Sequence, residues 1–131
     1  MPLKESTNPN DWLRIANKDL DRVGVMLEND DPEAAGFYLQ QAVEKFLKAF
    51  LLSKGWELNR IHDLQALLND ALKHDPSLEI YRAPCQKITG FYIVERYPFI
   101  VASGLTKDDV QTSLDKIKGF VERIRSKITV S

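Results

Sequence analysis

The chain has 131 residues, of which 44% are hydrophobic and 28% are charged, and its formal net charge is −1. These proportions exclude a disordered chain and fit one globular domain over residues 1–131, with a core over about residues 9–128. The balanced charge argues against a general nucleic-acid binder, which needs an excess of basic side chains. No apolar run is long enough to span a membrane or to act as a signal peptide. We therefore expect a cytoplasmic protein that makes no membrane contact.

The first predicted helix runs from about Pro9 to Glu28. Asn8 precedes it as a helix cap, and Pro9 suits the first helical position because that residue needs no amide hydrogen. Apolar residues then recur every three to five positions along one side, as expected of a helix packed on a core.

The second predicted helix, from about Pro32 to Lys54, is the most apolar segment of the chain. Asp31 and Pro32 open it, and Gly55 follows its end. Apolar side chains fill more than half of its circumference, so we expect it at the centre of the fold. A narrow polar stripe remains, which we expect to face an open groove or a partner: Gln40, Gln41, Glu44, Lys45 and Lys48.

Two further helices are predicted before residue 97. A short one covers about Asp63 to Lys73, and a longer one begins after Asp75-Pro76 and ends near Arg96. Pro84 lies inside the longer segment, where it marks either a kink or a restart.

The last predicted helix has the clearest beginning. Thr106 and Asp109 form a variant capping box, with aspartate in place of the usual glutamate. Apolar residues from Val110 to Ile128 then alternate at spacings of four and three, which suits packing against a nearly parallel helix. The sequence therefore predicts an all-α fold, an up-and-down bundle of four to five antiparallel helices.

Few side chains in this sequence suit metal binding or nucleophilic catalysis. The single Cys85 falls on an inward helical face and fits a small core residue better than a nucleophile. His62 and His74 flank the third predicted helix, where capping, packing or a dipole contact is the expected role. No zinc spacing or glycine-rich phosphate loop is present, so we expect no metal, no cofactor and no catalytic residue of these kinds.

Three segments together resemble a known family. They are Ala-Val-Glu-Lys-Phe-Leu-Lys-Ala-Phe-Leu at 42–51, His-Asp-Leu at 62–64 and Tyr-Ile-Val-Glu-Arg-Tyr-Pro at 92–98. In this order and spacing they are similar to the HEPN family (higher eukaryote and prokaryote nucleotide-binding domain), and most of all to its small stand-alone prokaryotic members. The resemblance covers roughly Trp12 to Ile128.

The resemblance implies a bundle of four or five helices that commonly dimerises around a cleft. Many HEPN proteins are ribonucleases that carry an Arg-x4-6-His motif at this cleft. Others are non-catalytic companions of minimal nucleotidyltransferases and form toxin–antitoxin-like pairs with them.

The ribonuclease motif is incomplete in this sequence. Arg96 matches its arginine, but positions 101–103, where the histidine would fall, are Val, Ala and Ser. RNA cleavage through the 2′-hydroxyl needs a group that exchanges protons near neutral pH, and arginine stays protonated. We therefore expect a non-catalytic nucleotide- or partner-binding module. The alternative is a metal-independent endoribonuclease that uses Arg96 with a substituted acid–base group.

The predicted ligand-binding cleft comprises Arg96, Glu44, Lys48 and Tyr97. Its ligand would be a nucleotide or an RNA phosphate, and its protein partners a second copy of the chain and a minimal nucleotidyltransferase. Each residue also has a structural interpretation: Arg96 would offset helix carbonyls, Glu44 and Lys48 would form a surface ion pair, and Tyr97 would end its helix before a proline. The apolar segment 99–101 is a candidate dimer or partner contact.

Overall fold

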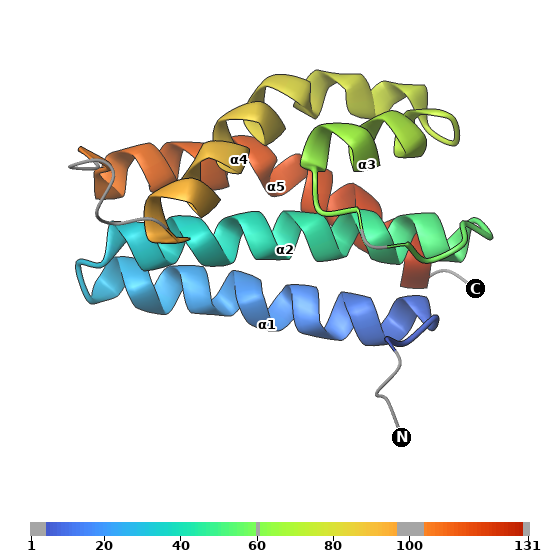
Figure 1. Ribbon diagram of the computed structural model, residues 1–131, viewed down its shortest axis with the longest axis horizontal. Helices are drawn as coiled ribbons and strands as arrows, with labels where there is room; N and C mark the ends of the chain where they lie inside the picture. Colours follow the sequence, from blue (N-terminus) through green and yellow to red (C-terminus); the bar gives the residue numbers. More distant parts are fainter. Residues whose placement is uncertain (1–4, 60, 97–103, 130–131) are drawn as a thin grey trace.

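The computed structural model describes residues 5–59, 61–96 and 104–129, with residues 92–96 and 129 described by their backbone alone. Within these ranges the chain is helical and has no strand. The four long helices alternate in direction along the sequence (Figure 1), which confirms the predicted all-α bundle. The elements are α1 (Pro9–Glu28), α2 (Pro32–Ser53), α3 (Leu64–Leu72), the 3-10 helix η1 (Pro76–Tyr81), α4 (Arg82–Arg96) and α5 (Lys107–Thr129).

The helices begin where the capping residues predict. The Asn8 side chain accepts a hydrogen bond from the Asn10 amide at 2.9 Å, which satisfies one of the free amides at the start of α1. At the start of α5, the Thr106 hydroxyl accepts from the Asp109 amide, and the Asp109 carboxylate accepts from the Thr106 amide, both at 3.1 Å. This reciprocal pair confirms the capping box with aspartate as its acidic member.

The break near Pro84 is a restart rather than a kink. The 3-10 helix η1 ends at Tyr81 and α4 begins at Arg82. Pro84 therefore lies in the first turn of α4, where its missing amide hydrogen has no intrahelical acceptor to lose.

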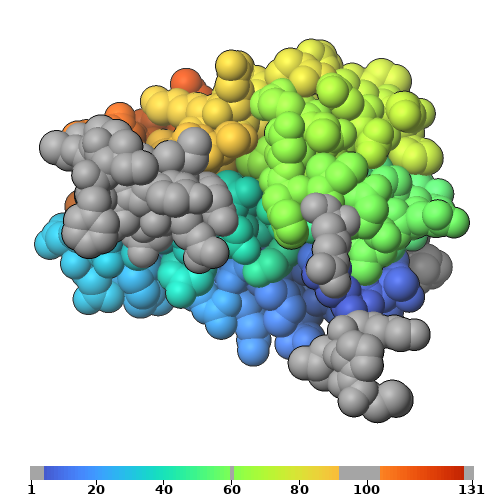
Figure 2. All heavy atoms as spheres, in the orientation of Figure 1, coloured from blue at the N-terminus to red at the C-terminus, as the bar shows by residue number. Residues whose placement is uncertain are grey.

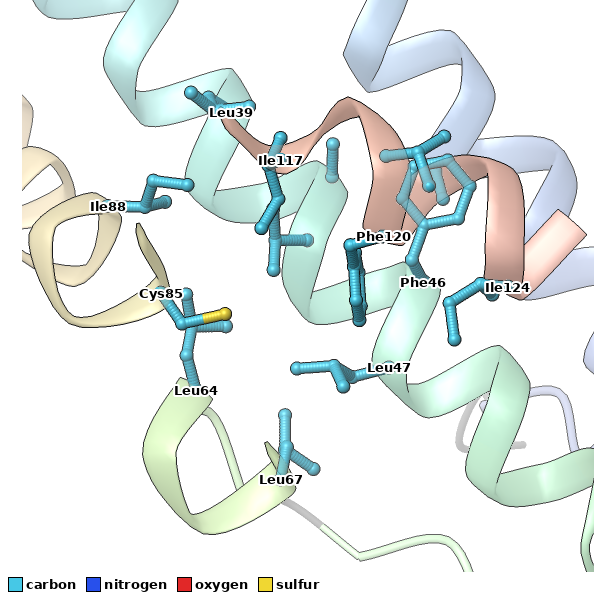
Figure 3. Packing of buried hydrophobic residues seen from close by; sticks show 14 of the residues in the cluster. Leu39, Phe46, Leu47, Leu64, Leu67, Cys85, Ile88, Ile117, Phe120 and Ile124 are labelled. Atoms are coloured by element: carbon cyan, nitrogen blue, oxygen red, sulfur yellow. The ribbon is translucent and has the colours of Figure 1, made fainter. Parts of the chain in front are cut away.

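Helix α2 is the centre of the bundle, as its apolar circumference predicts. It packs against α1, α3, α4 and α5, whereas α1, among the described residues, packs only against α2 and α5. Figure 3 shows side chains of α2 meeting those of three other helices in the core. They are Leu39, Phe46 and Leu47 from α2, Leu64 and Leu67 from α3, Cys85 and Ile88 from α4, and Ile117, Phe120 and Ile124 from α5.

Helices α2 and α4 approach closely at Gly36. A Cβ atom at this position would lie 2.9 Å from the Cβ of Phe91, closer than packed carbon atoms allow. We expect Gly36→Ala to lower the free energy of unfolding by about 1–3 kcal/mol, because the helices must separate. The control is Gly90→Ala on exposed α4, where nothing lies within 4 Å. It should raise stability by about 0.5–1 kcal/mol through helix propensity alone. Urea titrations of both variants test this, and a shift in the same direction for both would contradict it.

Asp75 ties η1 to α5. Its buried carboxylate accepts from the Ser77 amide at 3.1 Å and from Arg123 Nε at 3.0 Å, and Lys127 Nζ lies 3.5 Å away. The hydrogen bond from the Ser77 hydroxyl is the main cause of a lowered Asp75 pKa, and the charges of Arg123 and Lys127 lower it further.

This lowered pKa predicts how Asp75 contributes to stability as the pH changes. The carboxylate is bound more weakly by protons in the folded chain than in the unfolded one. Its contribution is therefore complete above the unfolded pKa, about 3.9, and is lost as the pH falls through the folded pKa. We expect Asp75→Asn to destabilise the protein at pH 7 and to have a smaller effect at pH 3. Urea midpoints at the two pH values measure the difference, and an equal effect at both would rule out this role.

Candidate functional site

Glu44 and Lys48 lie one helical turn apart on α2, and both are buried. Glu44 is 5% exposed and Lys48 only 1%. The Lys48 ammonium lies 3.3 Å from Oε2 of Glu44. The surface ion pair considered from the sequence is therefore wrong, and so is the expectation that the polar stripe faces an open groove. Gln40, in the same stripe, is also buried.

Helix α1 covers much of this stripe. The Lys48 ammonium lies 5.3 Å from the ring centroid of Trp12, a distance that suits a cation–π contact. On the face drawn in Figure 2, spheres of α1 (blue) and of α3 and α4 (green to gold) flank a narrow strip of α2. An ammonium group can leave water only when other groups replace its hydration. The Trp12 ring and the Glu44 carboxylate are those groups.

A second buried acid joins α1 to the stripe. Asp19 of α1 is 2% exposed and forms ion pairs with Lys45 of α2 and, at 2.6 Å, with Arg22 of α1. Asp19 was not among the site residues predicted from the sequence. Its signal is an acidic residue among the apolar positions of an amphipathic helix, which requires a basic partner on the neighbouring helix.

His62 also binds Glu44. Its Nδ1 lies 3.2 Å from Oε2 of Glu44, while its side chain is 66% exposed. It does not cap α3, because Asp63 does so by accepting from the Gln65 amide at 2.9 Å. A capping role for His62 is therefore wrong. His62 connects the segment after α2 to the middle of α2, and Glu44 has the neighbouring Gln40 amide at 3.4 Å as well.

His74 has the packing role that its position after α3 suggests. Its ring meets the edge of Phe50 with a centroid distance of 6.3 Å. Cys85 is buried, and burial raises the pKa of its thiol to about 12. A thiol with that pKa is almost entirely protonated near neutral pH, so Cys85 is a core residue rather than a nucleophile, as predicted.

The other half of the predicted cleft lies at the end of α4. Arg96 is the last residue of α4, but its side chain, Tyr97 and the apolar segment 99–101 lie outside the described residues. The α4 backbone runs antiparallel to α2 (Figure 1) and reaches Gly36 with Phe91. The structure thus brings Glu44 and Lys48 together with His62 and Trp12. A common cleft with Arg96 and Tyr97 stays a prediction.

Two classes of site are not found within residues 5–59, 61–96 and 104–129. No three histidine, cysteine or acidic side chains gather where they could hold a metal ion. No helix in the same ranges is long and apolar enough to cross a membrane.

Comparison with known proteins places the fold. The model of the HEPN domain matches residues 9–127. The crystal structure of TT1696 from Thermus thermophilus is 25% identical, with a TM-score of 0.75 over 93% of this chain and 99% of that one. ST0689, an archaeal HEPN homologue, has the same fold at 24% identity, with a TM-score of 0.67 over 93% and 98% of the two chains. A search of curated proteins gave no significant match. The chain therefore belongs to the HEPN domain family.

Proposed function

We propose that this HEPN domain is a non-catalytic module that binds a nucleotide or a protein partner. It would act in the cytoplasm as a homodimer, together with a minimal nucleotidyltransferase, in a toxin–antitoxin-like pair. One observation carries the proposal: the sequence has Val, Ala and Ser at positions 101–103, where the resemblance to HEPN ribonucleases requires a histidine.

The chemistry of Arg96 supports binding rather than cleavage. A guanidinium group holds a phosphate with two parallel hydrogen bonds but does not accept a proton at physiological pH. Without acid–base help, a cleavage step is typically slower by about a hundredfold to ten-thousandfold. The buried thiol of Cys85 offers no replacement.

A second candidate function is favoured by the contact between His62 and Glu44. A carboxylate on one ring nitrogen orients an imidazole, and the other nitrogen has no partner among the described residues. His62 is therefore the best group to replace the missing histidine. The alternative is a metal-independent endoribonuclease in which Arg96 binds the phosphate and His62 exchanges protons.

An RNA cleavage assay separates the two functions. Purified protein would be incubated with end-labelled single-stranded RNA in EDTA, beside the variants Arg96→Ala and His62→Gln. His74→Gln serves as the matched control, because His74 packs on Phe50 away from Glu44. The non-catalytic proposal expects no cleavage by any of the proteins. Cleavage by the wild type that both test variants lose, while His74→Gln keeps it, would establish the ribonuclease instead.

Binding is tested by recovering the tagged protein from its native cells. The proposal expects a minimal nucleotidyltransferase in stoichiometric amount, identified by mass spectrometry. Calorimetry with ATP tests the nucleotide site, and Arg96→Ala should weaken any binding that depends on the phosphates. Recovery of the bare protein together with a flat titration would remove both parts of the proposal.

A further inference from the structure

Helices α1 and α5 form a groove on the outside of the bundle. It encloses about 370 Å³, with Leu20 and Gly24 on the α1 side and Leu114 and Val121 on the α5 side. Both helices pack on α2, so their outer faces diverge and leave apolar side chains between them. Val25, the residue after Gly24, is 48% exposed although it is a large apolar residue.

Gly24 is the least expected residue of this groove. It lies in the interior of α1, where glycine costs about 1 kcal/mol relative to alanine. No atom within 4 Å would meet a Cβ at this position, so nothing in the described part of the chain requires a glycine. A bare backbone here lets a second helix approach α1 closely.

The charges around the groove are balanced. Asp21 on α1 has no ion-pair partner in the part of the chain that the structure describes. Lys118 on α5 has an exposed partner, Asp115, at 3.2 Å. The remaining two charged residues, Glu122 and Arg125, pair with each other at 3.7 Å. Two acids and two bases do not favour a polyanion such as RNA.

These charges fit a second copy of the same chain. In a two-fold dimer the same patch serves both molecules, so the α1 side of one copy meets the α5 side of the other. Asp21 of each copy would then face Lys118 of the second copy, twice over. The net charge of −1 per chain adds little repulsion between the copies.

We infer that the α1–α5 groove is the homodimer interface and that the same groove of a second copy fills it, with closest approach at Gly24. The inference rests on the homodimer of the proposed function and adds the surface through which it forms. The expected contact buries the apolar floor and Val25 and pairs Asp21 with Lys118 across the interface.

The test is the substitution Gly24→Glu. The space around Gly24 is open and glutamate is a good helix former, so the single chain should fold normally. In the dimer the two new carboxylates would meet across the two-fold axis, and the dissociation constant should rise about a hundredfold or more. Gly90→Glu on α4 is the matched control, because Gly90 is also exposed and open but lies on another helix. Sedimentation equilibrium gives the mass of each protein, and circular dichroism checks its helix content.

The outcomes separate the inference from the proposed function. A dimeric wild type with a monomeric, folded Gly24→Glu and a dimeric Gly90→Glu supports the inference. If Gly24→Glu stays dimeric, the groove is not the interface, while the proposed homodimer stands. A monomeric wild type removes the homodimer and the inference together. A monomeric wild type whose Gly24→Glu variant alone fails to capture the nucleotidyltransferase overturns the second copy as the occupant.

Discussion

Replacing Glu44 by glutamine will lower the free energy of unfolding by about 3–5 kcal/mol, far more than an exposed ion pair contributes. The substitution keeps the size of the side chain and removes its charge. Lys48, which is 1% exposed, would then keep a buried ammonium group with only the Trp12 ring and a neutral amide beside it. Urea titration at pH 7 measures the loss.

A second substitution shows that the stranded charge is the cause. Glu44→Gln combined with Lys48→Met removes both charges and fills the same space with a flexible apolar chain. The double variant should regain most of the lost stability, because paired buried charges contribute little net energy compared with apolar side chains. A loss below about 1 kcal/mol for the single variant would mean that Lys48 reaches water in solution.

Truncating Phe46 will have an effect of similar size through a different mechanism. The Phe46 ring is fully buried on α2, and the Arg125 guanidinium lies over it at 5.8 Å from the centroid. Phe46→Ala should cost about 3–5 kcal/mol, because it opens a cavity between α2 and α5 that the surrounding helices fill only in part. Chemical denaturation measures it. Ile80→Ala is the control: Ile80 is 71% exposed, so its truncation should change stability by less than about 0.5 kcal/mol. Similar losses for both variants would contradict the central place of α2.

The elements of this fold were predictable because their ends depend on near neighbours. Asn8, Asp31 and the Thr106–Asp109 box each act within three residues along the chain. The helix periods depend on spacing alone. Together with the resemblance of 42–51 and 92–98 to the HEPN family, these local signals sufficed for an all-α bundle that the comparison confirms.

The candidate site was less predictable because its contacts join distant parts of the sequence. Nothing near Lys48 in the sequence indicates that Trp12 covers it or that Asp19 binds Lys45 beside it. A polar stripe on a helix has the same sequence pattern whether it faces water or a polar patch on another helix. The contact of His62 with Glu44 likewise depends on how the chain crosses α2 after Gly55. Burial and pairing are properties of the assembled bundle.

The position of α1 at the margin of the bundle has a consequence for how the molecule opens. Within the described part of the chain, α1 is fastened only to α2 and α5, and its contact with α2 includes the ion pair of Asp19 with Lys45. When α1 detaches, these charged groups regain their hydration, which offsets part of the apolar contact that is lost. Helix α2 has no such route, because four helices surround it. The native state therefore contains a partly open form in which α1 is loose while the rest of the core persists, and the amide hydrogens of α1 exchange with solvent before those of α2.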